Sequence, residues 1–314
     1  MPRFSTGGQP TVWFRNLQIY RLVEPFEYGA EDLEKALDGR RFKPCAGLDT
    51  HSLGWAPAAG ADGTQLVHTA TGRLVVCLQR EDRLLPPSVI REEVEQRAAE
   101  VSTREGRPVG RKERRQLRDD VIVDLLPRAF TRNRYRHAYI DPPLGLLIVD
   151  CGTANQAEEL LSQLRESLGS LRATPLTVAQ TPSAVLTRWL ERRPPRGMQL
   201  GDECELREPV DNGAVVRGRR VDLAGGDLRP QLDAGLLASR VAITWQDRLT
   251  CVVGEDLGVR RLRFTDLVLD EAADVAAEDP LARFDADFVL MSNELAGFVP
   301  DLIDAFGGLE AAGD

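Results

Sequence analysis

Arginine is the residue type in this sequence with the clearest capacity for chemistry. Residues 104–136 contain eleven basic side chains against five acidic ones, although the whole chain has a formal net charge of −9. A guanidinium group is permanently charged and donates paired hydrogen bonds to phosphate oxygens. Contacts to phosphates require charge and donors but no pattern of base edges. The segment therefore predicts a surface that binds phosphate groups.

The first arginines of this segment lie in a predicted α-helix over 111–126. At about 100° per residue, Arg111, Arg114, Arg115 and Arg118 share one arc of the helix, and Glu113, Asp120 and Asp124 lie on the opposite side. The alternative interpretation is a solvated helix with i,i+4 ion pairs such as Arg115–Asp119. We favour phosphate binding, because the signs are segregated and the arginines continue beyond the end of the helix.

The helix is followed by "LLPRAF" (125–130), where Pro127 interrupts an apolar run. Phe130 comes three residues later, with Arg128 beside it and further arginines at 132, 134 and 136. We expect Phe130 to be presented at an exposed tip surrounded by positive charge, rather than buried in its own subunit.

A second basic group occurs in "VVRGRR" (215–220), in or beside a predicted strand. Arg219 and Arg220 are its adjacent pair, and they are candidate phosphate ligands. An exposed strand end without a function is the alternative interpretation. In a later strand, Arg261 and Arg263 are expected on one face, opposite the apolar side chains that alternate with them.

The C-terminal 49 residues, Asp266–Asp314, have the opposite charge, with thirteen acidic residues and one basic residue. One hypothesis is that this acidic segment imitates DNA and inhibits a recombinase by direct contact. The other interpretation is that the carboxylates form the solvated face of helices whose apolar side builds core or dimer surface.

Motifs for catalysis, metals and cofactors are absent from the sequence. The three histidines, at 51, 68 and 137, have no metal-ligand spacing, and the five cysteines form no C-x-x-C pair. No phosphate-binding glycine loop or nucleophile elbow occurs. No lysine has the acidic residue two positions before it that metal-dependent nucleases often show. We therefore predict free thiols, no metal, no cofactor and no enzyme, and a nuclease is the least supported hypothesis.

Hydrophobic patterning predicts an α+β fold with mixed helices and antiparallel sheets. We expect a strand over 11–22, a hairpin over 65–80 that turns at Thr71-Gly72, a strand over 145–151 and an antiparallel meander over 235–264. Helices are expected over 29–39, 88–101, 111–126, 155–169 and 182–193, with a last helix over 285–306 interrupted or kinked at Pro300. No apolar run is long enough for a membrane span, and the N-terminus has no secretory signal, so we expect a cytoplasmic protein.

An ordered series of stretches resembles the recombination-associated protein RdgC family over essentially the whole chain. The matching stretches are "WFRNLQIYRL", "FKPC", "LGWAP", "LLPPSVI", "LLPRAF", "GLLIVDC", "LRESLGSL" and "RFDADFVLM". The resemblance implies a nucleoid-associated protein that binds DNA, mainly double-stranded, with little sequence preference. It also implies restraint of RecA-promoted recombination, in replication-fork maintenance.

The resemblance further implies an elongated subunit and a ring-shaped homodimer whose positively charged hole accommodates duplex DNA. Two interfaces are implied, an apolar base and a gate formed by the tips. The aromatic residue of "LLPRAF" belongs to that gate, which assigns Phe130 to it and places Arg128 beside it. The basic group corresponds to Arg219 and Arg220. The family has a polar residue at the next position, where this chain has Val221, so we assign no DNA contact there.

On this basis the chain is expected to contain three regions. Residues 1–85 form the N-terminal part of a central and base α+β region, and 86–140 form a helical tip, or gate, region. Residues 141–314 complete the central and base region, including the antiparallel meander and the acidic C-terminal helices.

Overall fold

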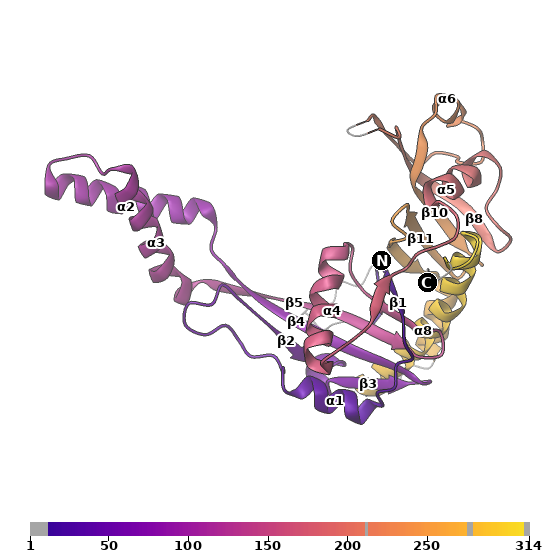
Figure 1. Ribbon diagram of the computed structural model, residues 1–314, viewed down its shortest axis with the longest axis horizontal. Helices are drawn as coiled ribbons and strands as arrows, with labels where there is room; N and C mark the ends of the chain where they lie inside the picture. Colours follow the sequence, from indigo (N-terminus) through magenta and orange to yellow (C-terminus); the bar gives the residue numbers. More distant parts are fainter. Residues whose placement is uncertain (1–11, 211–212, 275–278, 311–314) are drawn as a thin grey trace. The chain divides into compact units, whose positions relative to one another are not determined.

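The computed structural model describes residues 12–210, 213–274 and 279–310 (Figure 1). The chain divides into two compact units. The first unit comprises the described residues of Met1–Gly39, Pro57–Cys77 and Arg136–Asp314, and the second comprises Arg40–Ala56 and Leu78–Tyr135. Helices and antiparallel sheets are mixed, which confirms the predicted α+β class.

One sheet has the strand order β2-β4-β5-β6-β1-β7, with β3 paired to β4. The residues of the two long strands, β4 and β5, are divided between the units, and β2 belongs to the second unit. The β3–β4 hairpin turns at Thr71 and Gly72, both at positive φ, as predicted. The strands of this sheet are β1 (Gln18–Leu22), β2 (His51–Ala56), β3 (Val67–Ala70), β4 (Arg73–Leu84), β5 (Phe130–Asp141), β6 (Leu146–Val149) and β7 (Ala173–Pro175).

The first unit contains a second, antiparallel sheet with the order β12-β11-β10-β8-β9. The predicted meander over 235–264 is confirmed as three of its strands, and the arginine pair 219–220 lies at the end of its edge strand β9. The strands are β8 (Met198–Arg207), β9 (Val215–Arg219), β10 (Leu237–Trp245), β11 (Leu249–Gly254) and β12 (Val259–Phe264).

The last helix, α8 (Pro280–Ala305), connects the cores of the two sheets within the first unit. Phe288 packs against Tyr139 of β5, with ring centroids 5.9 Å apart. Farther along the same helix, Phe298 packs against Trp245 of β10, with ring centroids 5.7 Å apart. The buried residues of α8 recur at helical spacing, so one apolar stripe of the helix serves both sheets.

Smaller helices complete the first unit. The predicted helices over 29–39, 155–169 and 182–193 are confirmed with shifts of one or two residues at their ends. The helical segments are α1 (Ala30–Asp38), η1 (Gly60–Asp62), α4 (Ala154–Leu168), α5 (Pro182–Glu191), α6 (Arg229–Asp233) and α7 (Asp266–Asp274).

The second unit contains a pair of packed helices, α2 (Pro87–Glu105) and α3 (Arg111–Leu125), followed by the 3₁₀ turn η2 (Leu126–Arg128). Gly106 ends α2 in the left-handed conformation that favours glycine. Both helices were predicted, and α2 is longer than expected. The predicted tip region of residues 86–140 lies in this unit as far as Tyr135.

Two predictions about element ends are wrong. The strand expected over 11–22 begins only at Gln18, because side chains distant in sequence take up the earlier backbone donors. Asp150 accepts hydrogen bonds from the amides of Arg15 and Asn16 at 3.0 and 2.9 Å. The last helix was predicted over 285–306, interrupted or kinked at Pro300; it begins earlier, at Pro280, and the interruption is wrong, since α8 continues through Pro300 to Ala305. Residue 11 lies outside the described residues.

Within the described ranges, no helix is both long enough and apolar enough to cross a bilayer.

Candidate nucleic-acid interface

The predicted arginine stripe of α3 is exposed. Arg111, Arg115 and Arg118 lie on the surface of the second unit. Within the described part of the chain, none of the three makes an ion pair or a side-chain hydrogen bond, and the alternative Arg115–Asp119 pair does not form. These guanidinium groups therefore retain their full charge and all their donors for a ligand.

The stripe is supported from its other side by α2. Arg97 of α2 donates to Asp124 of α3 at 2.8 Å and to Glu93 of its own helix at 3.0 Å. Arg114, which the sequence placed in the same arc as the other three arginines, departs from that prediction because it pairs with Glu95 of α2. Asp124 and Glu95 are thus engaged between the two helices, and no carboxylate of the described residues pairs with Arg111, Arg115 or Arg118.

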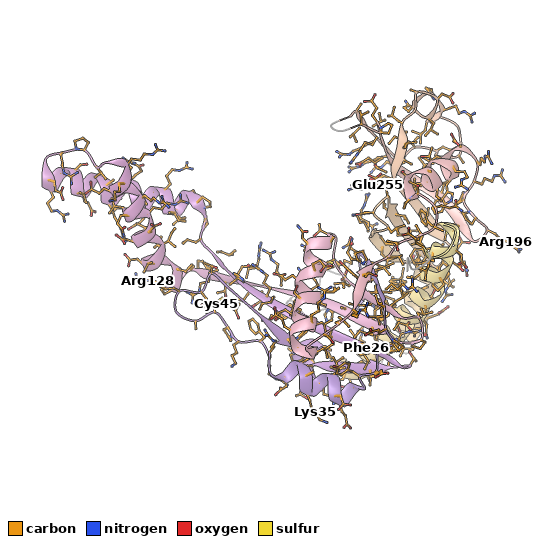
Figure 2. The ribbon with its side chains drawn as sticks, in the orientation of Figure 1. Phe26, Lys35, Cys45, Arg128, Arg196 and Glu255 are labelled. Carbon is orange, nitrogen blue, oxygen red and sulfur yellow. The ribbon has the colours of Figure 1, made fainter. Side chains whose placement is uncertain are left out.

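The turn after α3 presents the predicted aromatic residue. Arg83 donates to the carbonyl oxygens of Leu126 and Gly47 at 2.9 and 2.7 Å, and these bonds fix the position of η2. Phe130 follows as the first residue of β5 and is 85% exposed, so its predicted exposure is confirmed. Arg128 beside it is also exposed (Figure 2). The ring of Phe130 is therefore accessible to another molecule.

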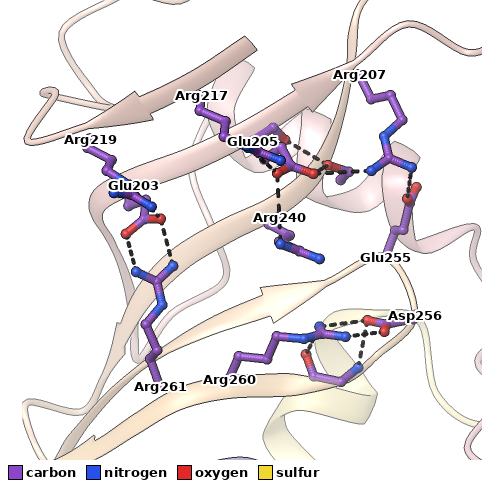
Figure 3. Close-up of polar contacts among 12 residues, drawn as sticks. Glu203, Glu205, Arg207, Arg217, Arg219, Arg240, Glu255, Asp256, Arg260 and Arg261 are labelled. Carbon is purple, nitrogen blue, oxygen red and sulfur yellow. Dashed lines mark hydrogen bonds and ion pairs between the residues drawn. The ribbon is translucent and has the colours of Figure 1, made fainter. Parts of the chain in front are cut away.

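The first unit carries a second arginine group, on the outer face of its second sheet (Figure 3). We call this the sheet face, and it consists of Glu203, Glu205 and Arg207 of β8, Arg217 and Arg219 of β9, Arg240 of β10 and Arg261 of β12. Alternate residues of β8, such as Cys204 and Leu206, point into the core. Strand alternation therefore places the charged residues on one surface.

A single carboxylate, that of Glu205, lies at the centre of three of these arginines. Arg217 Nε donates to Glu205 Oε2 at 2.8 Å, and Arg207 Nη2 donates to Oε1 at 3.3 Å. Arg240 Nη1 lies 3.8 Å from Oε2. The Ser239 hydroxyl donates to Oε1 at 3.0 Å. Three positive charges thus lie beside this one carboxylate, and Arg207 also approaches Glu255 at 3.9 Å.

Glu203 lies two residues before Glu205 on β8, so its side chain is on the same face of the sheet. Arg261 donates to both of its carboxylate oxygens, at 2.5 and 2.6 Å. Arg219 Nε approaches Glu203 Oε1 at 3.6 Å. The bidentate pair satisfies Glu203, so Arg219 is held loosely and remains exposed.

The two glutamates are ionised at neutral pH. Burial raises the pKa of Glu205, but hydrogen bonds from Arg217 and Ser239 and the charge of Arg240 outweigh it, so the pKa lies below its ordinary value. The hydrogen bond from Arg261 lowers the pKa of Glu203 in the same direction. At neutral pH both carboxylates therefore neutralise part of the positive charge of the sheet face.

Beside the sheet face, Arg220 follows the last residue of β9. Its backbone has a φ of 55°, which is uncommon for a residue with a side chain. Arg220 is exposed and forms no ion pair with any residue that the structure describes. The two arginines of the predicted pair therefore differ in their contacts: Arg219 approaches Glu203, whereas Arg220 does not.

Comparison with known proteins gives one consistent result. A family model described as "Putative exonuclease, RdgC" matches residues 12–309. The chain belongs to the RdgC family. Proteins named "Recombination-associated protein RdgC" are 37% identical over 300 residues in Aeromonas hydrophila subsp. hydrophila and 40% identical over 301 residues in Halorhodospira halophila. The alignments cover 95% and 96% of this chain and 99% of each relative.

The RdgC-family resemblance expected from the sequence is thereby confirmed. A third relative with the same name, from Tolumonas auensis, is 37% identical over 301 residues, which is 96% of this chain and 100% of the relative. The description of the RdgC family model mentions an exonuclease, whereas the names of the relatives mention recombination. Among the residues that the structure describes, no group of three or more histidine, cysteine or acidic side chains could hold a metal ion.

Several arginines of the sheet face were not predicted as ligands from the sequence. Arg207, Arg217 and Arg240 were not proposed as ligands, although they surround Glu205. Alternation along β8 would have placed Arg207 on the face of both glutamates. Arg240 gave no local signal, since it is a single charge within an apolar strand.

Proposed function

We propose that this chain binds DNA, mainly double-stranded, with little sequence preference. The main observation in support is that Arg111, Arg115 and Arg118 of α3 are exposed and lack ion-pair partners in the described residues, although the chain has a net charge of −9. Arg128, Arg219 and Arg220 belong to the same proposed set of phosphate ligands. Exposed guanidinium groups without partners favour a polyanion, because each neutralised phosphate releases counterions.

We further propose that two copies form a ring around duplex DNA and that the bound protein restrains RecA-promoted recombination, in replication-fork maintenance. The name shared by the relatives supports an association with recombination. The exposed ring of Phe130 supports a gate at which it docks into the partner subunit. On this proposal the protein is cytoplasmic and associated with the nucleoid.

The test is a titration of DNA affinity with salt, combined with the mass of the protein in solution. Affinity for duplex DNA should fall steeply with salt, with a log–log slope near −0.9 for each neutralised phosphate. Scrambling the DNA sequence should change affinity little, and the mass should equal that of a dimer. A slope near zero, or strong preference for one sequence, contradicts the proposal.

The competing hypothesis of an acidic DNA mimic has less support. Carboxylates of the C-terminal segment form intramolecular contacts: Asp279 caps α8, Asp301 accepts from Trp245 Nε1 at 2.8 Å, and Glu294 pairs with Arg248. The apolar face of α8 is buried in the core. Neutralising the exposed carboxylates of this segment should leave DNA binding intact, whereas a DNA mimic should lose its inhibition of a recombinase.

The description of the family model motivates a second candidate function, exonuclease activity. Incubation of end-labelled duplex with the full chain and Mg²⁺ tests it directly. Binding without shortening of the label supports the proposed function, and shortening in proportion to protein establishes the second.

A further inference from the structure

A hollow in the sheet face has the composition of a phosphate-binding site. Its lining includes four arginines and two glutamates, a formal charge of +2, and Val252 and Cys204 are apolar residues of the same lining. The arginines are Arg217, Arg219, Arg240 and Arg261, and the glutamates are Glu203 and Glu205. We infer that this hollow binds one phosphodiester group of the DNA backbone and that Glu205 is the positioning residue that arranges its arginines; the inference rests on the proposed function.

The charges around Glu205 exceed what a structural ion pair needs. The Glu205 side chain is only 6% exposed, and a buried carboxylate requires a charged partner and hydrogen bonds. Arg217 and Ser239 already supply them. Arg207 and Arg240 add two more positive charges beside the same carboxylate. Neighbouring like charges repel, and a bound anion would remove that repulsion.

Donors remain available in the hollow. In the described part of the chain, Arg217 uses only its Nε toward Glu205, so its two terminal nitrogens are free. Arg240 approaches Glu205 at 3.8 Å and donates no hydrogen bond to a described residue. Planar guanidinium groups with free N–H donors suit the oxygens of a phosphate.

Glu205 holds Arg217 in a defined orientation, which lowers the entropy that this long side chain loses when it binds a ligand. A carboxylate on a DNA-binding surface also repels phosphates, so positioning and repulsion have opposite effects. Glu205→Gln removes the charge while nearly preserving the shape of the side chain. Repulsion alone predicts tighter DNA binding by this variant, and positioning predicts weaker binding.

Glu255 provides a matched control. It is an exposed carboxylate that lies 3.9 Å from Arg207 and contacts neither Arg217 nor Arg240. Glu255→Gln therefore removes the same charge from the same region without disturbing the arginines of the hollow. Arg240→Gln is a second test variant, because Arg240 is exposed and its loss should not affect folding.

The experiment measures the affinity of the full-length variants for a duplex of about 30 base pairs, by fluorescence anisotropy, between roughly 50 and 200 mM salt. Glu205→Gln and Arg240→Gln should each bind about fivefold more weakly near 0.15 M salt, with a log–log slope shallower by about 0.9, the effect of one lost phosphate contact. Glu255→Gln should bind equally well or more tightly. Stoichiometric titration gives the active fraction, which a folding defect lowers without changing the slope.

The outcomes separate the inference from the proposed function. If the unsubstituted protein does not bind duplex DNA, the proposed function fails. If it binds and Glu205→Gln binds as tightly as Glu255→Gln, the positioning role is wrong while DNA binding stands. If both test variants keep their DNA affinity but lose the thermal stabilisation that inorganic phosphate gives the unsubstituted protein, the hollow binds free phosphate, and the inference about the DNA backbone is overturned.

Discussion

The two arginine groups of this protein differ in how their charges are held. On α3, Arg111, Arg115 and Arg118 have no carboxylate partner among the described residues. On the sheet face, Glu203 and Glu205 orient the arginines around them. An unpartnered arginine offers its whole charge but loses conformational freedom on binding, whereas a paired one offers less charge in a fixed geometry. On the proposed function, the α3 stripe would attract DNA, and the sheet face would fix where a phosphate lies.

The largest expected effect comes from reversing charge at Arg219 of the sheet face and at Arg220 beside it. Arg219→Glu together with Arg220→Glu changes the charge by four units at one strand end. Affinity for duplex DNA near 0.15 M salt should fall roughly a thousandfold, at about fivefold for each unit of charge. Both side chains are exposed, so thermal unfolding should change little. Unchanged affinity in the folded variant removes this pair from the DNA-binding surface.

A smaller effect is expected from neutralising the α3 stripe. Substitution of Arg111, Arg115 and Arg118 by Gln removes three charges without adding repulsion. Affinity should fall on the order of a hundredfold near 0.15 M salt, and the log–log slope should become shallower by about 2.7. Association should slow more than dissociation accelerates, because these charges attract DNA at a distance. Stopped-flow kinetics checks the prediction, and a loss confined to dissociation contradicts the division of roles between the two groups.

Phe130→Ala is expected to affect the retention of DNA rather than attraction to it. If Phe130 docks into the partner subunit, its loss removes about 2 kcal/mol or more at an interface, equivalent to roughly a thirtyfold effect. The lifetime on closed circular DNA should shorten by that order, while binding to short linear duplexes should change little. The measurement is dissociation from relaxed circles at matched salt.

Tyr135→Ala is the control for Phe130→Ala, since Tyr135 is also an exposed aromatic residue of β5. It should behave like the unsubstituted protein in both DNA assays. Unfolding of Phe130→Ala would contradict the exposure of Phe130, and equal losses on circular and linear DNA would indicate a direct DNA contact instead of a gate.

The smallest expected effect is on the stability of the fold at acidic pH. The pKa of Glu205 lies below its ordinary value of 4.5 in the folded protein, so its ion pairs stabilise the fold above about pH 4.5 and are lost as the pH falls through the folded-state pKa. Urea unfolding between neutral and acidic pH should show that Glu205→Gln is less stable at neutral pH and that the difference disappears in acid. The effect is modest, because the partner arginines are exposed and screened. Variants of the α3 stripe should parallel the unsubstituted protein at every pH.

Local patterns were sufficient to predict much of the fold. The hairpin at Thr71-Gly72 and the α3 helix depend on residues close together in sequence, and both were predicted correctly. The strand expected from residue 11 failed because Asp150 provides the acceptor for Arg15 and Asn16, and no local pattern reveals a partner 135 residues away.

The candidate site likewise contains features that local sequence patterns predict and features that depend on distant residues. Exposure of Arg111, Arg115, Arg118 and Phe130 followed from helical periodicity and from the proline turn. The cluster around Glu205 requires the pairing of β8 with both β9 and β10, and the β8–β10 register contains irregularities that sequence alternation does not predict. The residues of the α3 stripe were predicted because their exposure depends on local sequence. The arginines around Glu205 were missed because their proximity depends on the register between distant strands.

The contacts of the N-terminal segment have a consequence for synthesis on the ribosome. The amide of Phe14 donates to Met291 Sδ, 277 residues later, and Leu17 pairs with Val259. At about 5–20 residues per second, these partners are made roughly 15–60 s after the segment that needs them. The second unit, by contrast, is complete once Tyr135 has emerged. The nascent chain must therefore carry the Phe14 amide without its acceptor, and the first unit completes its contacts only after Met291 has been made.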